Sequence, residues 1–228
     1  MTGRELKLAR RQRGWTQCDV AARLGVSQTY VALLEHDKRH FPPRLVRKAV
    51  TLFGMSASAL PLSLRTSTDT ELTRQLSALG YPGFAHVRPA RRRNPAEVLL
   101  AALGKDNLEA RVAEALPWLL LRYGAMSEVC KEWMVTQARL LGLTNRLGFT
   151  VTLAKQVAER RGETNSEVYR ALAQLEHELF RTRLAEPDTF CQGHFSQRQR
   201  EWLKNARPEA ARQWNLLTNW QPQHLQYG

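Results

Sequence analysis

The stretch from Thr16 to Glu35, TQCDVAARLGVSQTYVALLE, constrains the fold most strongly, because it encodes two short helices separated by a sharp turn. Thr16 can cap a helix through its hydroxyl, and Asp19, three residues later, can return the hydrogen bond as in a capping box. Gly25 supplies the backbone freedom that a tight turn needs, and Ser27 can cap the next helix. We therefore expect helices over residues 17–24 and 28–36.

The apolar residues of both predicted helices fall on one face. Val31 and Leu34 share a face of the second helix at a spacing of three. This face should bury against a set of apolar side chains, namely Leu6, Ala9, Trp15, Val20 and Val26. The opposite face presents Gln28, Thr29, Ala32 and Leu33. The Gln28 amide can pair bidentately with adenine, and methyl-bearing side chains can contact thymine methyls.

Charge favours a polyanionic partner. The chain has 34 Lys and Arg against 21 Asp and Glu, which gives a net charge of +13. Residues 1–60 hold 11 of the cations and four of the acids, a net charge of +7. More than half of the excess positive charge therefore lies in about a quarter of the chain, around the two predicted helices.

Helical periodicity continues along the chain, so the predicted fold class is all-α, with an N-terminal five-helix domain and a larger helical bundle or set of helical hairpins. The expected domains are 1–65 and 94–228, joined by a linker over 66–93 that holds a short helix and a basic run. The first domain should contain helices at 3–13, 17–24, 28–36, 43–53 and 56–60. The second should contain helices at 95–103, 107–123, 127–141, 144–161, 165–185, 197–205 and 208–219.

Residues 3–60 resemble the XRE, or lambda-repressor-like, helix-turn-helix family of bacterial and phage regulators. The matching elements are GRELKLAR, the Thr16-Gln17 opening, Ala21, Gly25-Val26-Ser27-Gln28, Leu34-Glu35 and the later LFGMSASAL. The resemblance implies binding of double-stranded DNA through the second of the two short helices, which would lie in the major groove.

The resemblance also implies a role for each matching residue. Contacts to DNA bases would come from Gln28, Thr29 and Leu33, and contacts to phosphates from Thr16, Gln17, Lys38 and Arg39. Arg10 and Glu35 occupy positions that often form a structural ion pair in the family. We expect no catalytic residue, no metal and no cofactor.

The remaining motifs predict little chemistry. Cys18, Cys130 and Cys191 are odd in number and far apart, which suits a reducing cytoplasm. Cys191 and His194 could supply only two of the four ligands that a structural zinc site needs. With no apolar run long enough for a membrane span, we expect a soluble, cytoplasmic, nucleoid-associated protein without a membrane partner.

One feature of the linker and one of the larger domain each allow two interpretations. The run Arg91 to Arg93 is either solvated or an arm that contacts DNA phosphates. Trp202, Trp214, Trp220 and Tyr227 either seal the domain's own core or form a docking surface for another protein.

Two functions remain open. In the first, the protein is a transcriptional regulator, a repressor that binds a palindromic operator as a homodimer. In the second, it is an antitoxin-like regulator that represses its own operon and neutralises a co-encoded toxin through its C-terminal helices. Both predict double-stranded DNA as a partner, and neither requires catalysis.

Overall fold

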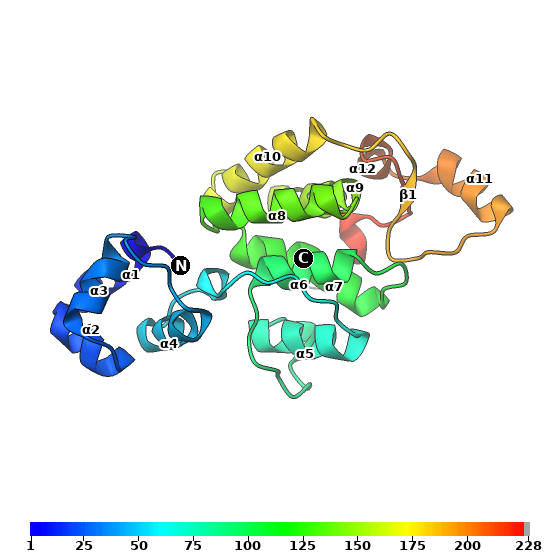
Figure 1. Ribbon diagram of the computed structural model, residues 1–228. Helices are drawn as coiled ribbons and strands as arrows, with labels where there is room; N and C mark the ends of the chain where they lie inside the picture. The colour runs from blue at the N-terminus through cyan, green and yellow to red at the C-terminus, as the bar shows by residue number, and fades with distance from the viewer. Residues whose placement is uncertain (226–228) are drawn as a thin grey trace. The chain divides into compact units, whose positions relative to one another are not determined.

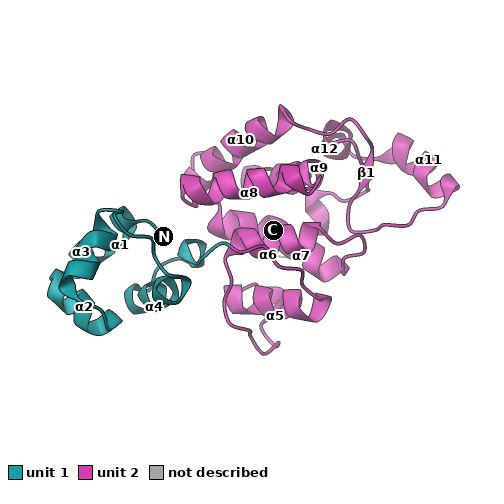
Figure 2. Ribbon diagram, in the orientation of Figure 1, with its two compact units in different colours: residues 1–62 teal, residues 63–228 magenta. Residues whose placement is uncertain are grey.

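The computed structural model describes residues 1–225, and the chain divides into two compact units, Met1–Leu62 and Ser63–Gly228 (Figure 2). Within the described residues the fold is all-α, as predicted, apart from two strands of two residues each. Tyr227, one of the aromatic residues considered above, lies outside the described residues.

Unit 1 contains α1 (Gly3–Gln12), α2 (Gln17–Leu24), α3 (Gln28–Glu35), α4 (Pro43–Phe53) and the short 3-10 helix η1 (Ala57–Ala59). The predicted fifth helix, 56–60, is thus a single 3-10 turn, because Leu60 already has an extended backbone. The first four helices lie where the caps and the apolar periodicity place them.

The core of unit 1 forms between the apolar faces of α1, α2, α3 and α4. Its fully buried side chains include Leu6, Val20, Val31 and Leu34. Helix α1 lies so close to the end of α3 that a Cβ on Gly3 would stand 2.1 Å from the Leu34 carbonyl oxygen. This close packing holds α1 against the helix that carries the predicted base-contacting residues.

Unit 2 is a helical assembly around the buried helix α9 (Figure 1). Its helices are α5 (Asp69–Leu79), η2 (Pro82–Phe84), α6 (Pro95–Leu103), α7 (Ala110–Tyr123), α8 (Glu128–Leu140), α9 (Thr144–Arg160), α10 (Glu167–Phe180), α11 (Gln197–Ala206), α12 (Glu209–Gln213) and η3 (Pro222–His224). Every α9 residue from Thr144 to Ala154 is buried, since α6, α7, α8, α10 and α12 all pack against this helix.

The last predicted helix, 208–219, is wrong beyond residue 213. The chain leaves α12 through Asn215, whose φ is 51°, and forms strand β2 (Leu216–Leu217) in parallel with β1 (Asp188–Thr189). Trp214 anchors this change of direction, because its buried ring lies against Gly148 and its Nε1 donates to Thr152 Oγ1 at 2.7 Å. Tertiary packing therefore overrides the local helical pattern here.

The structure also corrects the expected linker over 66–93. These residues belong to unit 2, which begins at Ser63. Helix α5 buries Leu72, Leu76 and Leu79, so that the apolar face of this helix is part of the core. Within this segment, residues 82–84 form η2, and the residues that follow connect η2 to α6.

Candidate nucleic-acid interface

Local caps set the start of both helices of the predicted DNA-binding motif. The Thr16 hydroxyl accepts from the Asp19 backbone N–H at 3.1 Å, and Asp19 Oδ2 accepts from the Thr16 N–H at 2.8 Å. Gly25 ends α2 in the left-handed region with φ 72°, and the Ser27 hydroxyl then accepts from the Tyr30 N–H. The chain is thereby fixed at both ends of the turn between α2 and α3.

The exposed face of α3 begins with the predicted base-contacting residues. Gln28 and Thr29 are exposed, whereas Leu33, one turn further along, is half-buried. Val31 and Leu34 on the opposite face are fully buried. The loop that follows exposes Lys38 and Arg39 to solvent.

A chain of hydrogen bonds connects this exposed face with the core. Arg10 donates to Glu35 through Nε at 2.5 Å and through Nη2 at 3.0 Å. Gln17 Nε2 donates to the same carboxylate at 2.9 Å, and Gln28 Nε2 donates to Gln17 Oε1 at 2.7 Å. The orientation of the Gln28 amide is therefore coupled, through two intermediates, to a guanidinium that also donates to the Trp15 carbonyl.

Glu35 accepts the central hydrogen bonds of this series as a charged carboxylate. Its side chain is buried, which by itself raises its pKa, but hydrogen bonds from Arg10 and Gln17 outweigh the burial and lower the pKa below the usual value. The Glu35 hydrogen bond in turn raises the pKa of Arg10. Both partners remain ionised at neutral pH, so the pair is a permanent part of the fold.

A family model described as a helix-turn-helix domain matches residues 2–62. Residues 2–62 are a helix-turn-helix domain. The matched range coincides with unit 1 and contains all the residues whose motifs resemble the XRE family. No curated protein and no solved structure matches the chain. The presence of this domain supports the interpretation that the protein is a DNA-binding regulator. The matched residues include none of the helices of unit 2.

The helix-turn-helix domain uses some of its cations internally. Arg23 lies over the Trp15 ring at 4.2 Å from its centroid, and Lys48 Nζ donates to the Leu24 carbonyl at 2.9 Å. The lysine thus neutralises the negative end of α2. The sequence did not predict these two contacts, because Trp15 is 8 residues from Arg23 and Leu24 is 24 residues from Lys48 along the chain.

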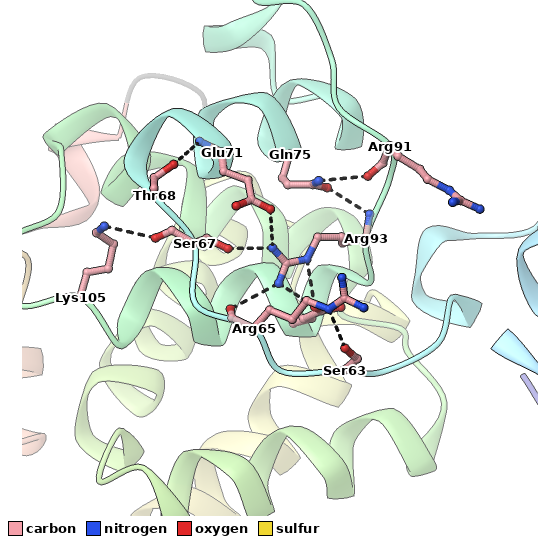
Figure 3. A network of polar contacts seen from close by, with 10 residues as sticks. Ser63, Arg65, Ser67, Thr68, Glu71, Gln75, Arg91, Arg93 and Lys105 are labelled. Atoms are coloured by element: carbon pink, nitrogen blue, oxygen red, sulfur yellow. Dashed lines mark hydrogen bonds and ion pairs between the residues drawn. The ribbon is translucent and has the colours of Figure 1, made fainter. Parts of the chain in front are cut away.

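The basic run Arg91 to Arg93 divides between surface and core (Figure 3). Arg91 and Arg92 are exposed, although Arg92 Nε donates to the Ala78 carbonyl at 2.9 Å. Arg93 is only 7% exposed and donates to Glu97 Oε1 through Nε at 2.9 Å and Nη2 at 2.6 Å. The predicted DNA arm therefore excludes Arg93, which is a structural residue.

Arg93 also fixes the segment that opens unit 2. Its Nη1 donates to Ser67 Oγ at 2.7 Å and to Glu71 at 3.2 Å, and its Nη2 donates to the Arg65 carbonyl at 3.4 Å. Its backbone N–H donates to the buried Gln75 side chain (Figure 3). One guanidinium thus joins residues 65–71 to α6.

The tryptophans of the C-terminal segment also divide between core and surface. Trp214 is fully buried, whereas Trp202 on α11 is 58% exposed. Trp202 lines a cleft of about 410 Å³ together with Phe195 and Trp220. The core interpretation is therefore confirmed for Trp214, whereas the docking interpretation stays a prediction for Trp202.

The three cysteines differ in their surroundings. Cys130 is buried beside Asn94, and burial raises the pKa of Cys191 far above its usual value. Within residues 1–225, no group of three or more His, Cys, Asp or Glu side chains is placed to hold a metal ion. In the same range, no helix has both the length and the apolar character that crossing a bilayer requires.

Proposed function

We propose that this protein is a sequence-specific transcriptional regulator that reads double-stranded DNA with α3. The hydrogen-bonded chain from Arg10 through Glu35 and Gln17 to Gln28 carries the proposal. An exposed glutamine on a surface that has no ligand gains little from a fixed orientation. A glutamine that reads a base gains specificity, since its amide is already oriented before DNA arrives.

This series of hydrogen bonds leaves a donor or an acceptor available on both glutamines. The Gln28 amide donates one N–H to Gln17, so its second N–H and its carbonyl oxygen can form the bidentate pair with adenine N7 and N6. The Gln17 amide donates one N–H to Glu35, and its second N–H can donate to a phosphate. Base recognition and phosphate contact can therefore occur together without breaking the chain.

The other contacts surround these two residues. Thr29 and Leu33 extend base recognition along α3, where a threonine or leucine methyl can meet a thymine methyl. Thr16 at the start of α2, with Lys38 and Arg39 after α3, would contact phosphates and set the register on the duplex. All except the half-buried Leu33 are exposed in the structure.

We further propose that the protein acts as a repressor on a palindromic operator, as a homodimer. Helix α3 has eight residues and can reach only a few base pairs, too few to select one site in a genome. Two copies whose recognition helices are about one DNA turn apart read both halves of a palindrome and add their binding energies. A dimer bound in this way at a promoter excludes polymerase.

Selection from random duplexes tests this function directly. The expected result is a palindromic consensus with half-sites about 10 base pairs apart. The selected duplex should be bound at least about 1000-fold more tightly than random duplex at physiological salt. Recovery of no consensus, with equal affinity for all duplexes, would remove the sequence-specific function.

A second candidate function is the antitoxin-like one, in which unit 2 also binds a co-encoded protein. The exposed Trp202 beside an aromatic-lined cleft favours it, because tryptophans at interfaces often dominate binding. Trp202→Ala should abolish capture of the product of a neighbouring gene and leave operator binding unchanged. Deleting the whole C-terminal segment is a poorer test, since Trp214 is part of the core.

A further inference from the structure

Helix α8 in unit 2 carries an apolar stripe that faces solvent. The inner face of α8 buries Cys130, Met134, Val135 and Ala138. The stripe consists of Val129, the half-buried Trp133, the polar Thr136 and Leu140. These residues recur on the outer side at spacings of four, three and four, the repeat of residues that pair one helix with another. Val129 is 58% exposed and Leu140 is 74% exposed, the largest exposure among the large hydrophobic residues that the structure describes.

The charges beside the stripe select its partner. Glu132 and Arg139 each precede a stripe residue, on the same flank and seven positions apart, and both are exposed. A second α8 in antiparallel orientation brings Glu132 of one copy next to Arg139 of the other, twice. A parallel copy would place Glu132 near Gln137 and leave the charges unmatched. Antiparallel helices also align their dipoles favourably.

Intramolecular contacts leave this arrangement possible. Arg139 lies 3.4 Å from Glu178 of α10, and both side chains are about half exposed, so this surface pair orients the guanidinium and is weak. Glu128 pairs with Lys131 at 2.7 Å near the start of α8. Neither contact covers the apolar stripe.

We infer that the outer face of α8 is the surface through which a second copy of this chain binds, antiparallel and about a twofold axis. The stripe pairs with itself, Val129 against Leu140 and Trp133 against Thr136, as a twofold contact requires. The inference rests on the proposed function, in that this dimer supplies the two recognition helices that a palindrome needs.

The size of the contact sets the strength of the dimer. Thirteen residues of α8 span about 20 Å, so the seam is smaller than the roughly 1600 Å² that a standard interface buries. We therefore expect a weak free dimer, with a dissociation constant on the order of micromolar. DNA then favours the dimer, because each copy occupies one half-site.

Sedimentation of the full-length chain between roughly 1 and 100 µM, without DNA, tests the inference. The wild type should shift from monomer to dimer over this range. Leu140→Glu should raise the dimer dissociation constant at least about 100-fold, because the twofold places residue 140 at the interface twice. At concentrations where the wild type is monomeric, its thermal melting should be unchanged, since the Leu140 side chain is 74% exposed.

Two controls identify the surface. Leu8→Glu places the same charge on an exposed leucine of unit 1 and should leave the dimer intact. Glu132→Arg and Arg139→Glu should each weaken the dimer about tenfold, and the double variant should restore it to within about threefold. A wild type that is monomeric throughout, dissociation by Leu8→Glu alone, or charge variants without mutual rescue would each overturn the inference.

Binding experiments with DNA distinguish failure of this inference from failure of the proposed function. On the selected operator, Leu140→Glu should bind with reduced cooperativity while retaining its affinity for a single half-site. If no operator can be selected but the wild type dimerises and Leu140→Glu does not, the proposed function fails and the inference stands. If Leu140→Glu and the wild type bind the operator with equal cooperativity and sediment alike, the inference fails and the proposed function stands.

Discussion

Arg10 in unit 1 and Arg93 in unit 2 form the same kind of buried ion pair, but the hydrogen bonds around the two pairs lead to different parts of the molecule. Each guanidinium donates two hydrogen bonds to a carboxylate whose side chain is almost fully buried, Glu35 for Arg10 and Glu97 for Arg93. The bonds around Glu35 continue outward to Gln28 on an exposed helix face. Those around Arg93 end on the chain segment 65–71.

The comparison shows that an ion pair does not by itself indicate a function. Its consequence depends on what the remaining donors and acceptors reach. In unit 1 they reach the exposed amide of Gln28, so the pair orients a side chain on the surface. In unit 2 they reach backbone and neighbouring side chains of the same fold, so the pair stabilises that fold.

The largest expected effect comes from breaking the pair in unit 2. Arg93→Ala leaves Glu97 buried without its counterion and should lower the stability of unit 2 by about 3–5 kcal/mol. Denaturant unfolding, followed by hydrogen exchange in α5 and α6, measures the loss. Arg91→Ala, an exposed neighbour, is the matched control and should change stability by less than about 0.5 kcal/mol. Equal effects of both variants would remove the distinction between the two arginines.

The next effect is on DNA recognition by unit 1. Gln28→Ala should cost about 1–3 kcal/mol of binding free energy on the selected operator and little on random duplex. Titration of both duplexes by fluorescence anisotropy measures the difference. Gln12→Ala, an exposed glutamine at the end of α1, is the control. Equal losses on both duplexes would exclude Gln28 as a base-contacting residue.

A smaller effect is expected from the phosphate contacts beside α3. Lys38→Ala should weaken binding to every duplex similarly and reduce the slope of log affinity against log salt by about one. Affinities measured between roughly 50 and 200 mM salt give the slope. A slope equal to that of the wild type would show that Lys38 does not contact a phosphate.

The smallest effect is the pH dependence of unit 1. Because folding lowers the pKa of Glu35, its charged form contributes stability above the unfolded pKa of about 4.3, and this is lost as pH falls through the folded value. Stability should therefore decline on acidification below about pH 4.3, and less steeply in Glu35→Gln. The same measurement on Asp19→Asn separates the contribution of Asp19, because hydrogen bonds from Thr16 also lower the pKa of Asp19. Identical pH profiles for wild type and Glu35→Gln would contradict this assignment.

Much of unit 1 was predictable because its signals are local. Thr16, Gly25 and Ser27 act within four residues of themselves, so they mark the ends of α2 and α3 in any context. The role of Gln17 as a phosphate contact stays a prediction, and the contacts of Gln17 within the fold were not predictable from the sequence. Its bonds to Glu35 and Gln28 join positions 18 and 11 residues away, which only folding brings together.

The sequence by itself determined the helical class, most helix boundaries, the helix-turn-helix motif and the charge that favours DNA, since these depend on residues a few positions apart. Only the tertiary structure decided that 66–93 is packed, that Arg93 is buried while Arg91 is not, and that the chain after residue 213 pairs as a strand. The reason is physical. Burial and long-range pairing depend on which surfaces meet, and a run of arginines or apolar residues looks the same in the sequence whichever surface covers it.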